Sequence, residues 1–166
     1  MKDLNLFILQ CQKDLESLGI KHGKVRSFLI NKRAKCRWGQ CKKAGFGLYD
    51  ISIAESLLQD NIDDQKLKDT IVHELLHTIQ GCFKHTGKWK ILAETVNREL
   101  PQYNIKRTAS YEEIGITDNR KEPVYRYILR CKSCGTEIKR QRLSKAVQNY
   151  KKYRCAKCGG KLERIL

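Results

Sequence analysis

The chain has 166 residues, of which 40% are hydrophobic and 31% are charged. These proportions are typical of a globular protein and exclude a wholly disordered or fibrous chain, and the sequence contains no run of 18 apolar residues that would predict a membrane span. The formal net charge of +16 indicates a strongly acidic partner.

The N-terminal segment predicts an amphipathic helix over residues 2–18, because apolar residues recur at helical spacing until Gly19. It lacks the apolar centre and cleavage site of a signal peptide, so we expect a cytoplasmic protein, associated with the nucleoid if its source is a bacterium. Runs rich in β-branched, aromatic or alternating apolar residues follow at residues 25–31, 34–41 and 45–54. Short turns separate these runs, which predicts a three-stranded antiparallel sheet.

Two further helices are predicted before the composition changes. Asp63 and Asp64 supply capping oxygens and negative charge, and apolar residues then recur at every fourth position until Gly81. A second helical pattern covers residues 88–100 and ends at a proline. Residues 103–123 show no sustained period and contain turn-forming residues, so we expect a connecting segment there.

The first of these two helices contains the sequence His-Glu-Leu-Leu-His at residues 73–77. His73 and His77 are one helical turn apart and can offer two imidazole nitrogens to one zinc ion. Glu74 lies beside them, where a carboxylate can take a proton from water acidified by the metal and deliver it to a leaving amine. The pattern is rare by chance in a chain with four His, so we predict a catalytic zinc site rather than two ordinary surface histidines.

A catalytic zinc site needs a third protein ligand. His85 is the favoured candidate, because it follows the helix end and a turn at Gly81 that lets the chain fold back towards the metal. Glu94, on the next helix, is the competing candidate, whereas His22 lies in a distant basic turn. Asp69 precedes His73 by one helical turn and could orient a ligand, although a stabilising acid near the helix N-terminus is the simpler role.

The C-terminal part contains two Cys-x-x-Cys pairs, each followed by a glycine that relaxes a tight turn. The four cysteines are Cys131, Cys134, Cys155 and Cys158. Two such pairs predict a four-thiolate structural zinc site, and make a redox role for one pair a weak alternative. The chain is therefore expected to bind two zinc ions and to divide into residues 1–102, a connecting segment at residues 103–123 and a β zinc ribbon at residues 124–166.

Four further cysteines are expected to be reduced and buried in a cytoplasmic protein, because free cysteine behaves as a small hydrophobic residue. They are Cys11, Cys36, Cys41 and Cys82. Their spacing is not that of a zinc knuckle, so we predict no third metal site.

Basic residues are concentrated in two places, since residues 124–166 hold 13 Lys or Arg against two Glu and residues 21–43 hold nine against none. Nucleic acid is the natural polyanion for this pattern, because each phosphate contact releases counterions. A merely solubilising surface, or weak adhesion to anionic membranes, is the alternative. Trp38 could stack on an exposed base or pack in the core. The candidate nucleic-acid-binding residues are Arg37, Trp38, Lys139, Arg140, Arg142, Lys151, Lys152 and Arg154.

Together these motifs resemble the SprT-like (Spartan-like) zinc metallopeptidases. The resemblance rests on His-Glu-Leu-Leu-His, on His-Thr-Gly-Lys-Trp-Lys from residue 85, on Arg-Trp-Gly-Gln-Cys from residue 37, and on the cysteine ribbon, in that family's order. It implies an α+β, minimal zincin fold, with His73, His77 and His85 as zinc ligands and Glu74 as general base. It also implies cleavage of proteins that are crosslinked to DNA.

We therefore expect a monomeric zinc metalloendopeptidase that acts on proteins bound to single-stranded or junction-containing DNA and has no membrane partner. One alternative is a nucleic-acid-binding zinc-ribbon protein with a vestigial or regulatory peptidase site, and the intact Glu74 argues against it. Another is a general peptidase whose positive charge holds acidic proteins. Tyr103 and Tyr111 are candidates for stabilising the oxyanion of the reaction.

Overall fold

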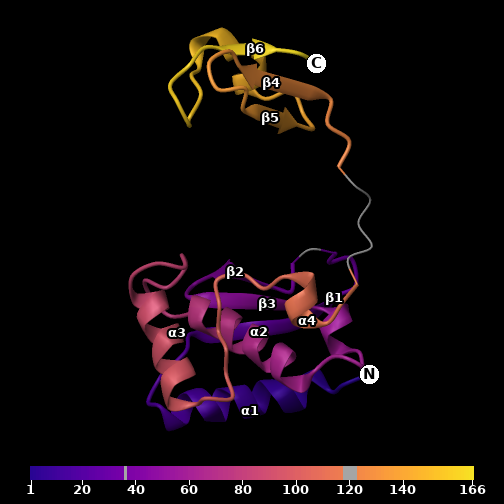
Figure 1. Cartoon of the computed structure of the whole chain (residues 1–166). Coiled ribbons are helices and arrows are strands. Elements are labelled where there is room, and N and C mark those ends of the chain that lie inside the picture. Colours follow the sequence, from indigo (N-terminus) through magenta and orange to yellow (C-terminus); the bar gives the residue numbers. More distant parts are fainter. Residues whose placement is uncertain (36, 118–122) are drawn as a thin grey trace. The chain divides into compact units, whose positions relative to one another are not determined.

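The computed structural model describes residues 1–35, 37–117 and 123–166. The chain forms two compact units, residues 1–118 and 119–166 (Figure 1). Both are built from short helices and small sheets, which confirms the predicted α+β class. None of the helices within the described residues has the length and apolar character needed to cross a membrane.

The first unit contains one sheet and the longer helices of the chain. Its elements are α1 (Leu4–Ser17), β1 (Lys24–Asn31), β2 (Gly39–Gly45), β3 (Leu48–Ala54), η1 (Glu55–Leu58), α2 (Asp64–His77), α3 (Lys88–Glu99) and α4 (Tyr111–Ile114). The strands lie in the order β1-β3-β2, with β2 antiparallel and β1 parallel to β3. The prediction of a wholly antiparallel sheet is therefore wrong, and the predicted strand at residues 34–41 begins only at Gly39.

The position of β3 explains this difference. β3 carries the buried side chains of Ile51, Ile53 and Ala54, whereas β1 and β2 contain only half-buried and exposed residues. The most apolar strand is the one that gains most from neighbours on both sides, so β3 takes the centre and separates β1 from β2. The connection after β1 leads to β2, at the opposite edge of the sheet. The sequence prediction assumed that each strand pairs with the next one along the chain, so it did not include this crossing.

Helix α2 passes between the sheet and α1 (Figure 1). Its N-cap is Asp63, whose side chain accepts a hydrogen bond from the Gln65 N–H. Leu67, Ile71 and Leu75 of α2 are fully buried. Burying a side chain of this size stabilises a fold by about 1.5–3 kcal/mol, so these three residues fix the rotation of α2 about its axis.

Residues 103–117 belong to the first unit, although the sequence predicted a connecting segment from residue 103. Tyr103, Ile105 and Ile114 are buried in the core of this unit. A capping box between Ser110 and Glu113 begins the short helix α4. Tyr103 and Ile105 alternate over too few residues, and α4 is too short, to show a strand or helix period in the sequence. The sequence therefore did not predict that this segment packs on the first unit.

The second unit is a small three-stranded sheet in the order β5-β4-β6. Its elements are β4 (Tyr127–Cys131), β5 (Glu137–Arg140), α5 (Lys145–Gln148), η2 (Tyr150–Lys152) and β6 (Leu162–Arg164). Among the described residues of this unit, five form the buried cluster, and two of them are cysteines. A core this small needs an additional crosslink to be stable, and a metal held by cysteines provides one.

Candidate metal centre and active-site cleft

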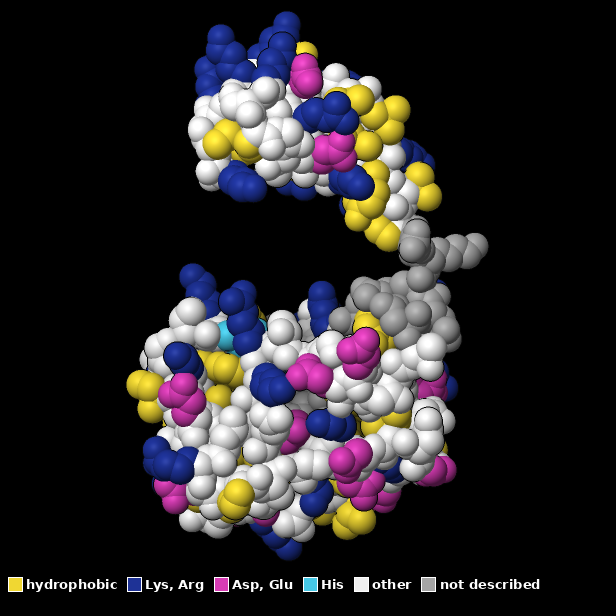
Figure 2. All heavy atoms as spheres, in the orientation of Figure 1, with side chains coloured by type: hydrophobic (Ala, Val, Ile, Leu, Met, Phe, Trp, Pro, Cys, Tyr) yellow, Lys and Arg dark blue, Asp and Glu magenta, His cyan; other side chains and the backbone are white. Residues whose placement is uncertain are grey.

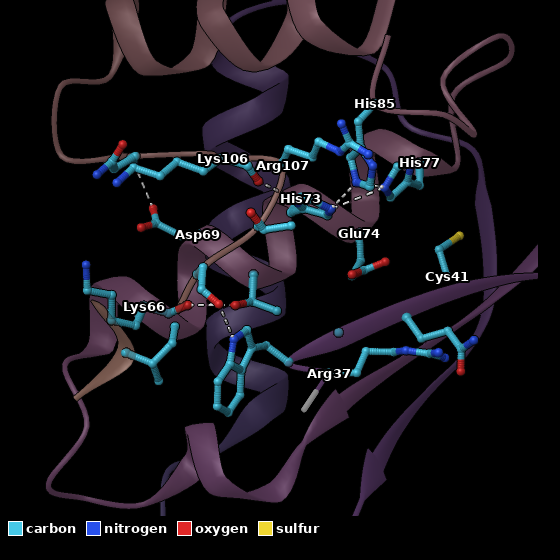
Figure 3. A pocket seen from close by; sticks show the side chains of 18 of the residues that line it. Arg37, Cys41, Lys66, Asp69, His73, Glu74, His77, His85, Lys106 and Arg107 are labelled. Carbon is cyan, nitrogen blue, oxygen red and sulfur yellow. Dashed lines mark hydrogen bonds between the residues drawn. The ribbon is translucent and has the colours of Figure 1, made fainter. Parts of the chain in front are cut away.

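The three histidines singled out in the sequence meet at one point. His73 and His77 project from the same face of α2, and His85 reaches them from the loop between α2 and α3 (Figure 3). The Nε2 atoms are 3.2 Å apart between His73 and His77, 2.9 Å between His77 and His85, and 2.8 Å between His73 and His85. A tetrahedral zinc ion with bonds of about 2.0–2.1 Å places its ligand nitrogens roughly 3.3 Å apart, so the cluster fits such an ion with a small outward adjustment.

Two backbone carbonyls orient the imidazoles towards this point. His73 Nδ1 lies 2.9 Å from the Lys106 carbonyl oxygen, and His77 Nδ1 lies 2.7 Å from that of Cys82. An N–H at Nδ1 donates to each carbonyl, which leaves the Nε2 lone pair available to a metal. Burial lowers the pKa of His73 to about 3, and the neighbouring His77 and His85 act in the same direction. Neutral imidazoles with converging lone pairs are the form that binds a metal ion.

Aromatic rings enclose the histidines. The Trp89 ring centroid lies 4.9 Å from that of His73, 5.5 Å from that of His77 and 4.6 Å from that of His85. Trp89 itself is 3% exposed, and the Phe83 ring also lies near His77. This apolar wall lowers the local dielectric constant and limits the orientations that the imidazoles can adopt.

Glu74 is buried beside the histidine cluster and is only 5% exposed. Burial raises the pKa of its carboxyl to about 7, while a backbone hydrogen bond from Cys41 and the charge of Arg37 act in the opposite direction. Gly39 lies directly against this carboxylate, and a Cβ at residue 39 would be 2.5 Å from Glu74 Oε1. The glycine in the Arg-Trp-Gly-Gln-Cys motif is therefore needed for space, a reason that the sequence alone did not supply.

A cleft of about 410 Å³ opens over the cluster. One wall is β2 with the residues that precede it, and the other is the extended segment 104–109, which we call the strap. The strap is attached at both ends: the Asn104 N–H donates to Asp69 Oδ1 at 3.0 Å, and the Trp38 indole N–H donates to the Ala109 carbonyl at 2.9 Å. These residues lie within the connecting segment predicted from the sequence, so the strap was not predicted.

A family model describes this unit. The model of the SprT-like family matches residues 9–109 of the chain. The chain belongs to the SprT-like family. The matched region contains most of α1, the sheet, the histidine cluster and the strap, and it ends before the four cysteines of the second unit. No curated protein matches the chain.

In this SprT-like unit, the other candidate ligands lie away from the cluster. Glu94 is an exposed residue of α3 that pairs with Lys90 at 3.6 Å. His22 interacts through its ring nitrogens with Gln12 and with the Gly23 carbonyl. Neither belongs to the group of metal-ligating atoms formed by the three histidines. The alternative of Glu94 as third ligand therefore has no support in the geometry.

Asp69 and the two tyrosines have structural partners. Asp69 accepts hydrogen bonds from the Asn104 N–H and from Gln65, so it holds the strap. Tyr103 is buried and donates to Asp14 at 2.6 Å. Tyr111 donates to the Lys35 carbonyl and packs edge-on against Trp38. Neither tyrosine is among the residues that line the cleft, so the geometry gives no support to either as a candidate for the oxyanion.

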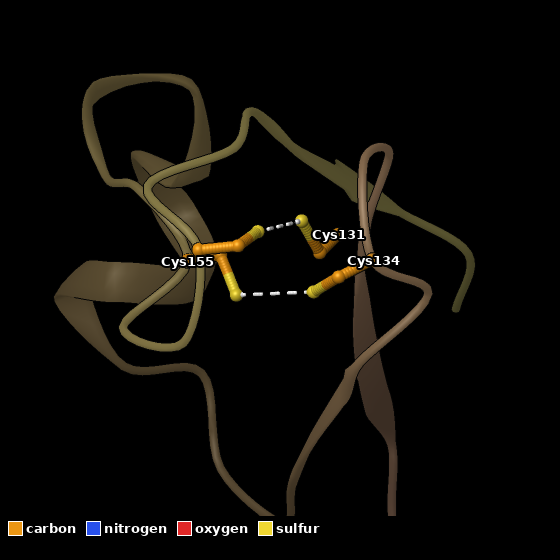
Figure 4. Close-up of side chains that lie close together, drawn as sticks. Cys131, Cys134 and Cys155 are labelled. Carbon is orange, nitrogen blue, oxygen red and sulfur yellow. Dashed lines mark hydrogen bonds between the residues drawn. The ribbon is translucent and has the colours of Figure 1, made fainter.

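The four cysteines of the second unit form a separate cluster (Figure 4). Their Sγ atoms lie within 4.8 Å of one another, with 3.4 Å between Cys131 and Cys158 and 3.6 Å between Cys134 and Cys155. A tetrahedral zinc ion with bonds of about 2.3 Å spaces its sulfurs roughly 3.8 Å apart, so these residues also fit a metal. Hydrogen bonds from the side chain and the backbone of Thr136 lower the pKa of the Cys134 thiol, whereas the pKa of the Cys158 thiol is raised. A metal binds the thiolate form, which the surroundings of Cys134 favour.

Glycines shape the turns around these cysteines. Gly135 and Gly159 have φ values of 70° and 72°, as the sequence predicted for the residue after each pair. Gly160 was not predicted: a Cβ there would lie 2.8 Å from Cys131 Sγ. The backbone at Gly160 therefore approaches the cluster more closely than any other residue type permits.

The four cysteines outside the second unit differ in burial. Cys11 and Cys82 are buried as expected, Cys41 is half-buried beside Glu74, and Cys36 lies outside the described residues.

Trp38 is half-buried against the core and donates its N–H to the strap, which favours the packing role over base stacking. Arg37 is exposed at the cleft. The basic candidates of the second unit are all exposed, namely Lys139, Arg140, Arg142, Lys151, Lys152 and Arg154.

Proposed function

We propose that this SprT-like chain is a zinc-dependent metalloendopeptidase with Glu74 as its general base. The observation that carries the proposal is the convergence of three imidazole Nε2 atoms, within 3.2 Å of one another, beside a buried carboxylate in an open cleft. His73, His77 and His85 would hold the catalytic zinc ion, and the four cysteines would hold a structural one.

The residues of the chain have distinct tasks in this reaction. When bound, zinc supplies Lewis acidity towards the scissile carbonyl and makes water more acidic. Glu74 accepts the proton that water gives up and returns it to the amine of the leaving segment. Glu74 is buried beside the histidine cluster, so its carboxyl is shielded from bulk solvent during both transfers. Gly39 and the N–H of Cys41 keep the carboxylate in place, and the strap keeps His73 oriented through the Lys106 carbonyl.

The proposed substrates are proteins that are bound to, or crosslinked with, DNA. The net charge of +16 and the exposed Lys and Arg residues of the second unit support this choice, because a polyanion would bring the substrate to the enzyme. On the face drawn in Figure 2, Lys and Arg side chains also lie beside the visible histidine surface of the first unit. We place the protein in the cytoplasm, or at the nucleoid of a bacterium, as a monomer.

The test compares cleavage of one protein in two forms, free and crosslinked to a single-stranded oligonucleotide, by the wild-type chain and by Glu74→Gln. We expect faster cleavage of the crosslinked form and, in the variant, a loss of about 10²–10⁴-fold on both forms. Equal cleavage of both forms by the wild type would indicate a general peptidase. Tight DNA binding with no cleavage would instead support a nucleic-acid-binding protein with a vestigial site.

A further inference from the structure

The hairpin between β2 and β3 presents a fully exposed phenylalanine. Phe46 lies at the tip of the hairpin between Gly45 and Gly47, and its side chain has no cover from the rest of the described chain. Its φ is 48°, a left-handed conformation that glycine or asparagine adopts readily and a bulky residue rarely does. Neither packing nor backbone geometry therefore accounts for an aromatic residue at this position.

Lysines flank this tip. The strand register places Lys24 of β1 opposite Leu48 and Lys43 of β2 opposite Tyr49, so both lysines lie at the hairpin end of the sheet, on either side of β3. The Lys43 ammonium lies 5.1 Å from the centroid of the Phe83 ring, which is 49% exposed and also borders the cleft. The hairpin end thus continues towards the candidate active site.

Acidic residues are absent from the sequence around this surface. Residues 17–49 and residues 75–93 contain no Asp or Glu. The two stretches meet in the structure, where the Gly23 N–H donates to Thr78 Oγ1 at 2.8 Å and Lys43 covers Phe83. A polyanion would therefore meet little repulsion here.

The lysine charges at the hairpin end are not neutralised. Asp50, the first acid after the hairpin, is occupied by hydrogen bonds from Arg26 and Ser27. Lys24 and Lys43 are exposed, and neither forms an ion pair with a carboxylate in the part of the chain that the structure describes. Both charges remain available to phosphate groups.

We propose that this hairpin surface, formed by Phe46, Lys24, Lys43 and Phe83, binds single-stranded nucleic acid. A base stacks on the Phe46 ring, and the adjacent phosphates lie against Lys43 and Lys24. An unpaired base offers its face to one ring, whereas a membrane requires a larger apolar area than a single phenylalanine provides. This inference rests on the DNA association in the proposed function and places one contact on the catalytic unit itself.

A site-specific probe tests the stack directly. We introduce Phe46→Trp into the full chain with Glu74→Gln and record the added tryptophan fluorescence, relative to the Glu74→Gln chain, during titration with an oligothymidylate. Stacking on a base predicts quenching of the added signal, with weaker quenching by a duplex of the same length. An added signal that does not change when the oligonucleotide binds would overturn the proposal, and so would equal quenching by the duplex.

Affinity measurements provide the second readout. Phe46→Asn removes the ring and suits the left-handed backbone, so the variant should fold at least as well as the parent. We expect its affinity for the oligothymidylate to fall about 5- to 100-fold, while Ile91→Asn, at an exposed position of α3, leaves the affinity unchanged. Lys43→Ala should reduce the dependence of log affinity on log salt by about 0.7.

The outcomes distinguish a nucleic-acid ligand from a lipid ligand, and the binding proposal from the peptidase proposal. Unchanged affinity in Phe46→Asn would contradict the proposal, as would quenching of the added tryptophan by vesicles of anionic lipid but not by the oligonucleotide. All the variants in these assays, including those of the affinity measurements, also carry Glu74→Gln, and they meet no protein substrate. A negative result therefore leaves the peptidase proposal standing, and a failure of the peptidase test leaves the binding result standing.

Discussion

The α-carbon of Gly39 lies so close to the Glu74 carboxylate that a Cβ at residue 39 would be 2.5 Å from Oε1. Gly39 begins β2, and Glu74 projects from α2, so the contact joins the sheet to the helix that carries the histidines. The carboxylate therefore lies between the histidine cluster and β2, and at residue 39 of β2 it leaves no room for a side chain. This relationship makes the position of the proposed general base depend on a residue with no chemistry of its own.

Gly39→Ala should displace the Glu74 carboxylate and lower the cleavage rate by about 10²-fold, because a shift of about 1 Å in a catalytic group has an effect of this size. The three histidines are untouched, so the zinc content should stay at two ions per chain. Cleavage rate and zinc content are measured together on the purified variant.

Gly19→Ala is the matched control for that change. Gly19 has a φ of 68°, and a Cβ there would contact nothing within 4 Å, so alanine strains the backbone at a residue that does not line the cleft. We expect a loss of stability of about 1 kcal/mol and normal cleavage at a temperature where the variant is folded. A similar loss of cleavage in both variants would mean that Gly39 acts through stability alone.

Trp38→Phe should loosen the strap, because it removes the indole N–H that donates to the Ala109 carbonyl and keeps most of the ring. We expect a loss of about 1 kcal/mol in the free energy of unfolding and a higher KM for a peptide substrate. Unchanged stability and an unchanged KM in Trp38→Phe would contradict the role of this hydrogen bond in holding the strap.

Chelation should affect the two units differently. Among the described residues, 22 form the buried core of the first unit, which should stay folded without metal, whereas the five-residue cluster of the second unit should not. Limited proteolysis after treatment with a chelator is expected to degrade residues 124–166 and leave a stable fragment that contains both tryptophans. Cys155→Ser should reproduce this pattern in the presence of zinc, and His73→Ala should not. A protease-resistant second unit after complete zinc removal would contradict this prediction.

Asn97→Ala should weaken the strap from a second side. The Asn97 side chain donates to the Ile105 carbonyl at 3.0 Å and accepts from the Ile105 N–H at 2.6 Å, and its loss leaves two backbone groups without partners. We expect a decrease of about 2 kcal/mol in the free energy of unfolding, measured by urea denaturation. Arg98→Ala, at an exposed position of α3, should change stability by less than about 0.5 kcal/mol. A change in Asn97→Ala no larger than that in Arg98→Ala would show that the strap does not depend on these bonds.

The sequence predicted the parts of the site that follow helical spacing. His73, Glu74 and His77 are local to α2, and a helix of known period places the two histidines on one face without knowledge of the tertiary fold. His85 was found because it is the only nearby histidine after the helix end. The four cysteines were found because two Cys-x-x-Cys pairs in one short segment are a specific pattern for a four-thiolate metal site.

The parts that the sequence missed depend on contacts between distant residues. The parallel pairing of β1 with β3 is set by the burial of β3, which local patterns do not specify. The strap has too few residues for a period, and its attachment through Trp38 and Asp69 joins segments 71 and 35 residues apart. Gly39 lay within the predicted strand at residues 34–41 and was given no role of its own, because its role exists only where β2 meets α2.

The most direct test of the central claim is cleavage of an unfolded protein substrate by the Glu74→Gln chain, with its zinc content measured on the same sample. We expect two zinc ions per chain and a cleavage rate lower than that of the wild type by about 10²–10⁴-fold. A zinc-loaded Glu74→Gln chain that cleaves as fast as the wild type would contradict the assignment of this site as a metallopeptidase centre with Glu74 as its base.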